Sequence, residues 1–287
     1  MPETTLTVAK TALAVGLEKP VKLMHITDSH LCRAYPDEGE KLVALAAARG
    51  EKCFGGEENA ERLFEQAVAY AKANADLAVF TGDIYDFLSR SNLEYMKKAL
   101  DSVPYFYVAG NHDFCTAPGA DPEDYPFKLR QLARVAPYVK DNLLMSSREI
   151  GGVNLVGLDD TYYQFTDGQT DFLRAEAAKG LPILLFLHNP LYTPRYAETC
   201  LASQGCAYLV GCPEEVLERY REPARAVYQR PNEATKRAVD CILHEPLIKA
   251  VFCGHSHHNF EEPLSNGVPQ ITTGGTFRGE ARLITVE

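Results

Sequence analysis

The sequence has no apolar run that could cross a membrane, and its basic residues are in the minority. No uninterrupted apolar stretch among the 287 residues reaches about 18 residues, so we expect no transmembrane helix and no membrane partner. With 29 basic and 39 acidic residues, the net charge of −10 disfavours binding of long nucleic acids. The first ten residues lack the basic start and apolar stretch of a signal peptide, which predicts a cytoplasmic protein.

The cysteines follow no zinc-binding or disulfide pattern. None of the eight belongs to a C-x-x-C pair, and the spacing of Cys200, Cys206 and Cys212 matches no zinc template. Because no export signal is apparent, we interpret all eight as free thiols that mostly pack as small apolar residues.

The chain also lacks internal repeats, low-complexity tracts and a clear linker, so we expect one domain over residues 1–287. Apolar runs predict strands at residues 21–27, 77–81, 103–109, 143–150, 153–159, 182–187, 250–253, 268–273 and 281–286. Helical spacing predicts helices at residues 57–73, 92–100, 127–135, 170–179 and 233–244. Three further expectations are an N-terminal hairpin at 4–8 and 11–15, a loop over 31–56 with one or two helical turns at 41–49, and a long irregular insert at 189–232.

A polar cluster, Gly110-Asn111-His112-Asp113, directly follows the predicted buried strand at 103–109. Asparagine, histidine and aspartate are costly to bury without partners, so four such residues are a poor way to build a core. They suit a site in which one residue binds a metal, one moves a proton and one orients the proton donor. Such a site needs further polar partners elsewhere in the chain.

The same arrangement recurs at five predicted strand ends. The polar residues that follow these strands are Asp28 and His30, Asp83, Asn111 and His112, His188, and His255 and His257. In α/β sheets, sites form at the carboxyl ends of strands, so these side chains should lie together. The set contains no thiolate, which favours Mn, Fe, Zn or Ni over a structural zinc site. Six or seven ligands are too many for one such ion but suit two ions that share a carboxylate.

Taken singly, several of these residues have plainer interpretations. Asp28 and Asp83 could be cap or turn residues after a strand, and His188 could be a core histidine. Asp86 is more readily a cap or a supporting residue than a ligand. The recurrence of the pattern at five strand ends favours the metal site over these alternatives.

Together the ordered motifs resemble those of the calcineurin-like metallophosphoesterases. They are Asp28-x-His30, Gly82-Asp83-x-x-Asp86, Gly110-Asn111-His112-Asp113, His188 and Gly254-His255-x-His257. The resemblance implies an α/β (α+β) fold built as a four-layer sandwich, in which two mixed sheets are flanked by helices. It also implies two divalent or trivalent metal ions, with Mn, Fe or Zn favoured, at the carboxyl ends of the strands.

The resemblance further assigns a role to each motif residue. It implies seven metal ligands: Asp28, His30 and His257 for one ion, Asn111, His188 and His255 for the other, and Asp83 between both. A hydroxide bridging the two ions would attack phosphorus in line. His112 would protonate the leaving oxygen, with Asp113 orienting its ring. Histidine has a suitable pKa for this task, and a carboxylate is the usual way to fix its tautomer.

The insert at 189–232 combines tyrosines with several arginines in an otherwise acidic chain. One interpretation is a lid that sets substrate selectivity, in which an arginine such as Arg195 binds a second anionic group of the substrate. The other is a solvated helix face. We expect Asn111, His112 and Arg195 to contact the substrate.

The leading hypothesis is therefore a metal-dependent phosphoesterase acting on a small phosphorylated substrate. A small nucleotide-like phosphodiester or phosphomonoester is favoured, whereas the choice between the two ester classes, the metal and the oligomeric state stay open. The alternative is a non-catalytic scaffold of the same fold that binds proteins. His112 together with a complete ligand set favours the enzyme, since a scaffold needs neither.

Overall fold

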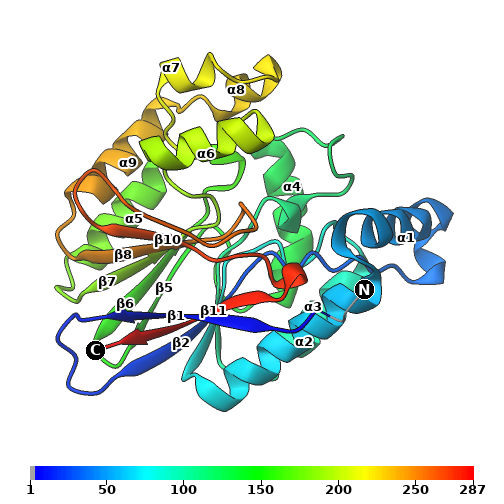
Figure 1. The fold of residues 1–287 in the computed structure, drawn as a ribbon, viewed down its shortest axis with the longest axis horizontal. Coiled ribbons are helices and arrows are strands. Elements are labelled where there is room, and N and C mark those ends of the chain that lie inside the picture. The colour runs from blue at the N-terminus through cyan, green and yellow to red at the C-terminus, as the bar shows by residue number, and fades with distance from the viewer. Residues whose placement is uncertain (1–3) are drawn as a thin grey trace.

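The computed structural model describes residues 4–287 and contains two mixed β-sheets that pack face to face (Figure 1). The five-stranded sheet has the order β1 (Thr7–Leu13), β11 (Glu280–Val286), β2 (Val21–Ile26), β3 (Leu77–Phe80), β4 (Tyr105–Tyr107). The six-stranded sheet has the order β5 (Met145–Ile150), β6 (Val153–Leu158), β7 (Ile183–Phe186), β8 (Ile248–Cys253), β10 (Pro269–Thr272), β9 (Phe260–Pro263).

Helices cover the outer face of each sheet. On the first sheet, α2 (Glu57–Asn74) packs against β2 and β3, and α3 (Arg90–Leu100) and α4 (Tyr125–Val135) belong to the same apolar cluster. α1 (Glu40–Phe54) packs against α2 and projects beyond the sheet (Figure 1). The second is covered by α5 (Asp167–Ala177) and α9 (Glu233–His244). Separate apolar clusters fill the two helix–sheet spaces and the space between the sheets. The expected four-layer sandwich is therefore confirmed.

The central strands are buried on both faces, as expected for strands between two covered layers. All four residues of β3 and all four of β7 are buried. Between the sheets, the rings of Phe186 and Phe252 stack at 5.3 Å, and Phe106 meets Phe186 edge-on. This apolar contact fixes the position of one sheet relative to the other.

Strand direction brings the expected polar loops to one edge of the sandwich. β2, β3 and β4 are parallel neighbours, and so are β6, β7, β8 and β10. Their carboxyl ends therefore lie together within each sheet, and the loops of both sheets meet there.

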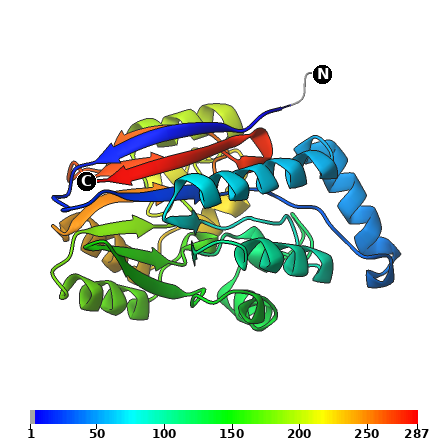
Figure 2. The same cartoon turned by 90° about the horizontal axis from the view of Figure 1, so that it is seen from below.

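The N-terminal hairpin that the sequence suggested is wrong. Residues 7–13 instead form one edge strand, β1, which pairs in parallel with β11 from the other end of the chain. Figure 2 shows these two strands lying side by side. β-Rich composition identifies a strand, but it does not identify a partner more than 270 positions away.

Two segments expected to be largely irregular are helical. Within the predicted loop at 31–56, α1 begins after Gly39 and ends at Gly55, whose left-handed backbone closes the helix. The insert at 189–232 contains α6 (Pro194–Gln204), α7 (Glu214–Leu217) and α8 (Pro223–Gln229). These helices enclose an apolar cluster of their own, so the insert is a packed structure.

The sequence also led to expectations about the cysteines and about membrane-spanning helices. All eight cysteines are free thiols, and six of them are buried, which confirms their interpretation as packing residues. Among the described residues, no helix combines the length and the apolarity that a membrane crossing requires.

The contact between the sheets gives a stability test. We expect Phe186→Ala to lower the free energy of unfolding by about 3–5 kcal/mol, because it opens a cavity in a fully buried aromatic cluster. Val227→Ala, at a side chain that is 65% exposed, should change it by less than about 0.5 kcal/mol. Urea unfolding monitored by circular dichroism measures both; equal effects would contradict this account of the core.

Candidate metal centre and adjoining pockets

Five of the expected ligands have left-handed backbone conformations. The φ angles are 50° at Asp28, 47° at His30, 52° at Asp83, 68° at His255 and 60° at His257. Such values are uncommon and unfavourable for residues other than glycine. Strain of this kind clusters at functional sites, where the surrounding structure holds it in place. Here it lies in three of the five strand-end loops.

Two glycines allow these loops to touch. Gly82 has a φ of 83°, and a Cβ atom at this position would overlap the backbone of Gly110. A Cβ atom on Gly110 would in turn overlap the Asp83 carboxylate and approach the His188 ring. The loops after β3 and β4 can therefore approach this closely only because both residues lack side chains.

Asp28, His30 and His257 form one group of converging ligand atoms. The Nε2 atoms of His30 and His257 are 3.0 Å apart. Asp28 Oδ1 lies 3.3 Å from His257 Nε2 and 3.7 Å from His30 Nε2. This oxygen is buried and has no hydrogen-bond partner among the described residues, so a buried anionic atom faces the two imidazoles.

A second group forms beside it around His188. The Nε2 atom of His188 lies 3.2 Å from His255 Nδ1, 3.2 Å from Asn111 Oδ1 and 3.3 Å from Asp83 Oδ2. Asp83 Oδ2 is also 3.8 Å from Nε2 of His30 in the first group. Asp83 therefore lies between the two groups, where a carboxylate shared by two ions would be needed.

The residues present fit two metal ions. Metal–nitrogen bonds of about 2.0–2.1 Å bring neighbouring ligand atoms to about 3 Å, close to the separations within both groups. The donors are oxygen and imidazole nitrogen, which suit Mn, Fe or Zn. Burial lowers the pKa of His255 to about 3 and also lowers the pKa of His257. By contrast, the surrounding carboxylates, Asp83 foremost, raise the pKa of His188 to about 10, and other carboxylates raise the pKa of His30. Because a metal binds the neutral imidazole, an ion at this site would displace the proton that these carboxylates favour.

His112 lies at the edge of this cluster with its ring held by Asp86. Its Nδ1 atom is 2.7 Å from the Asp86 carbonyl oxygen and 3.2 Å from Asp86 Oδ1, and its backbone N–H donates to Asp83 Oδ1 at 2.7 Å. Burial alone would lower the pKa of His112. The Asp83 and Asp86 carboxylates outweigh burial and raise this pKa to about 10.

The expectation that Asp113 orients the His112 ring is wrong. The Asp113 carboxylate accepts hydrogen bonds from the Gly110 N–H at 2.7 Å and the Tyr107 hydroxyl at 3.0 Å. Neighbouring residues in a tight 3₁₀ turn point in different directions, and Asp113 points back toward the strands. Burial, followed by the charge of Asp83, raises the pKa of Asp113 to about 7. Asp113 therefore braces the loop, and Asp86 contacts the ring.

Asp86 also connects the site to α1. Its carboxylate accepts from Arg49 Nε at 2.6 Å and Arg49 Nη2 at 2.9 Å, and lies 3.1 Å from His30 Nδ1. Sequence reasoning expected a supporting role for Asp86 but missed Arg49. No sequence signal distinguished Arg49, because α1 was expected to be mostly loop.

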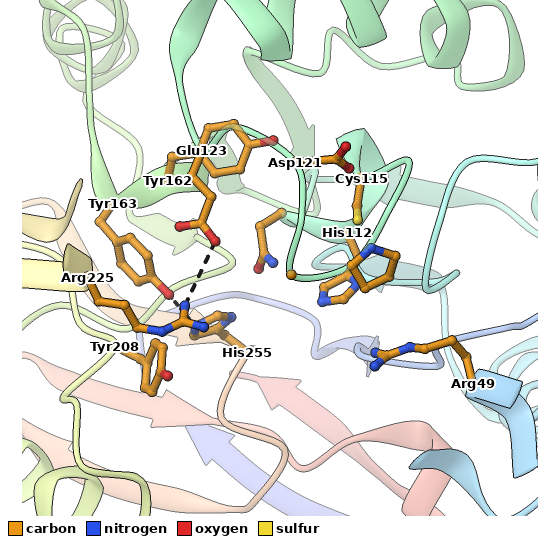
Figure 3. A pocket seen from close by; sticks show the side chains of 13 residues that line it. Arg49, His112, Cys115, Asp121, Glu123, Tyr162, Tyr163, Tyr208, Arg225 and His255 are labelled. Carbon is orange, nitrogen blue, oxygen red and sulfur yellow. Dashed lines mark hydrogen bonds and ion pairs between the residues drawn. The ribbon is translucent and has the colours of Figure 1, made fainter. Parts of the chain in front are cut away.

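Two pockets open from the ligand groups and share His112, Tyr208 and His255. The first, of about 300 Å³, is shown in Figure 3 and is also lined by Arg49, Asn111, Glu123, Tyr162, Tyr163 and Arg225. The second, of about 380 Å³, also includes Asp83, His257 and Arg278. The Tyr163 hydroxyl lies 2.9 Å from His255 Nε2. The first pocket thus combines two of the expected ligands, Asn111 and His255, with aromatic and charged walls.

Arg195, expected to contact the substrate, lines neither pocket. Its side chain is 64% exposed, donates to the Glu261 carbonyl oxygen and lies over the Phe260 ring. Arg225 on α8 lines the first pocket instead. The sequence marked both as arginines of one basic insert, and only the packing of α6 and α8 separates them.

Two mixed sheets that bring adjacent Asp, Asn and His groups to one edge define the class of metal-dependent phosphoesterases. A model of the calcineurin-like phosphoesterase family matches residues 21–259, and the chain belongs to this family. The resemblance found in the motifs is confirmed, and with it a hydrolase that depends on a dinuclear metal centre.

Solved structures share the fold at low sequence identity. A dimetal phosphatase from Danio rerio is 15% identical with a TM-score of 0.54, covering 91% of this chain and 89% of that chain. A phosphopantetheinyl hydrolase from Mycobacterium tuberculosis is 10% identical with a TM-score of 0.43, covering 90% of each chain. No curated protein matches the sequence.

The clustered carboxylates and imidazoles predict that metal stabilises the fold. At about 100 times its dissociation constant, Mn²⁺ should add about 2.7 kcal/mol of stability and raise Tm by about 5 °C. EDTA should reverse the shift in a thermal unfolding scan. Asp28→Ala should reduce it, whereas Asp240→Ala, at a side chain that is 74% exposed, should not. An unchanged Tm with Mn²⁺ and with EDTA would contradict the fit.

Proposed function

We propose that this protein hydrolyses a small phosphomonoester or phosphodiester, with a nucleotide-like substrate favoured. The observation that carries the proposal is the complete set of converging ligands with a proton donor beside it. The proposed ligands are Asp28, His30 and His257 for one ion, Asn111, His188 and His255 for the other, and Asp83 for both. When bound, such ions supply charge neutralisation at the phosphoryl oxygens and an acidified water nucleophile.

His112 is the proposed general acid. Expelling an alkoxide is difficult without a proton, and a positioned histidine supplies one. Asp86 accepts from Nδ1 and thereby leaves Nε2 as the ring atom that faces the pockets. The same carboxylate, with Asp83, favours the protonated ring. Asp86 is thus the positioning residue for His112, and its contact with Arg49 fixes the carboxylate in turn.

The dimensions and charge of the site support a small substrate. The pockets of about 300 and 380 Å³ hold a compact ligand, and both are bordered by His112. Asn111 and His112 are the proposed contacts to the phosphoryl group and the leaving oxygen. The net charge of −10 disfavours a long nucleic acid as the substrate.

The reaction class is tested with p-nitrophenyl phosphate and bis(p-nitrophenyl) phosphate. We expect the Mn²⁺-loaded protein to hydrolyse at least one of them and to lose the activity on chelation, with recovery when Mn²⁺ is restored. Relative rates on the two compounds measure the preference between monoester and diester. No turnover of either by protein shown to hold metal would argue against the enzyme and for a non-catalytic scaffold.

The general-acid role predicts a dependence on the leaving group. His112→Ala should retain its metal content and lose about 10²–10⁴-fold in kcat on an alkyl phosphate, because alkoxides need the proton. On p-nitrophenyl phosphate, whose leaving group is a good one, the loss should be much smaller. His244→Ala, at an exposed histidine, is the control. Equal losses on both substrates would exclude His112 as the proton donor.

A further inference from the structure

Arg225 is an arginine of the insert that lines the first pocket, beside the proposed catalytic centre. It belongs to α8, and Figure 3 shows its guanidinium pointing into the first pocket near Tyr163 and Tyr208. The same pocket is bordered by Asn111 and His112. A group bound at Arg225 would therefore lie on the same side of the centre as the proposed proton donor.

One edge of this guanidinium is held in place and the other is available. Nε donates to Glu222 at 2.7 Å, and the guanidinium carbon lies 5.4 Å from the centre of the Tyr208 ring. Neither terminal nitrogen makes a hydrogen bond to another described residue, and the approach of Nη1 to Glu123 is 3.9 Å. A guanidinium fixed on one edge offers two parallel N–H groups on the other, the geometry that carboxylates and phosphates accept.

The other arginines at the site are less suited to this task. Arg49 already gives Nε and Nη2 to the Asp86 carboxylate. Arg278, in the second pocket, is exposed, and its guanidinium lies over the neighbouring Phe277 ring. Arg225 is held by both an ion pair and an aromatic ring, so binding to it costs less side-chain entropy.

We propose that the first pocket receives the leaving group of the substrate and that Arg225 binds a second anionic group carried by it, a carboxylate or a phosphate. This inference rests on the proposed phosphoesterase function and names the substrate class: phosphate esters whose leaving alcohol is itself anionic. The three tyrosines of the pocket supply the walls that surround the leaving group.

The Glu123 carboxylate opposes the binding of an anionic group at Arg225. Its carboxylate lies 3.9 Å from Arg225 Nη1, spanning the pocket between the loop before α4 and the insert (Figure 3). Burial raises the pKa of Glu123, and the charge of Arg225 partly offsets this. An anionic group arriving at Arg225 replaces a long ion pair with a short bidentate one, but it meets the charge of Glu123. Substitutions of the two residues should therefore act in opposite directions.

The test uses non-hydrolysable probes of graded length. Phosphonoacetate, 3-phosphonopropionate, 4-phosphonobutyrate and 5-phosphonopentanoate carry a phosphonate for the metal centre and a carboxylate at increasing distance. Their carboxamides are neutral controls of nearly equal shape. Dissociation constants for Mn²⁺-loaded protein, measured by calorimetry, should favour at least one carboxylate over its amide by about 10–100-fold.

Three variants locate the effect. Arg225→Gln should abolish the preference for the carboxylate and leave amide binding within about twofold, whereas Glu123→Gln should strengthen carboxylate binding several-fold. Arg219→Ala, on the same insert but paired with Glu198 at the surface, should change neither. If Arg225→Gln fails to fold, the direction of the Glu123→Gln effect still decides the question.

Three results would overturn the inference. The wild-type protein could bind every carboxylate and its amide equally. The preference could survive Arg225→Gln, or it could disappear in Arg278→Ala instead. Failure of the proposed function looks different, because it is an absence of phosphate ester hydrolysis by metal-loaded protein. Hydrolysis of p-nitrophenyl phosphate without any carboxylate preference would refute the role of Arg225 and leave the phosphoesterase intact.

Discussion

The structure depends on burying several carboxylates in one place. Asp28, Asp83, Asp86 and Asp113 are all within 1% exposure, and isolated buried anions of this kind would destabilise the fold by several kcal/mol each. Backbone N–H groups, histidines and Arg49 compensate most of this cost, while Asp28 Oδ1 stays without a hydrogen-bond partner among the described residues. The left-handed backbones and the touching glycine loops follow from this need, since they direct the compensating groups inward. The same buried carboxylates make this edge of the fold suited to bind cations.

The compensation also connects the proposed catalytic parts to each other. Asp86 contacts His30 on the metal side, His112 on the proton-transfer side and Arg49 from α1. One carboxylate thus relates the orientation of a proposed ligand to that of the proposed acid. Asp113, by contrast, holds the Gly110 loop against the strand through Tyr107. Asp86 therefore supports His112 directly, through its ring, whereas Asp113 supports it indirectly, through the Gly110 loop that carries it.

The sequence predicted what depends on local pattern and missed what depends on tertiary contacts. Polar residues at the ends of apolar runs identified the ligand loops, because strand direction and the strand-end rule together place them at one edge. The core strands followed from apolar runs, and α2, α3, α4, α5 and α9 followed from helical spacing. Local pattern did not predict the pairing of β1 with β11. It also did not show that Asp86 rather than Asp113 contacts the His112 ring, or that Arg225 rather than Arg195 lines the first pocket. Each is a choice between chemically equivalent candidates, and only packing across distant segments distinguishes them.

The proposed roles divide the molecule into strand-end loops that carry the chemistry and an insert that sets selectivity. Its helices enclose their own apolar cluster, with Tyr196, Leu209 and Tyr220 among its buried members, so its stability does not rest on the carboxylate network. Of its residues that line the two pockets, Tyr208 borders both and Arg225 borders the first. Under the proposed role of Arg225, a change at that position alters what the first pocket accepts. A site built from mutually dependent buried polar contacts tolerates little change. An adjoining unit with its own apolar cluster is therefore the part of this chain to which we assign substrate preference.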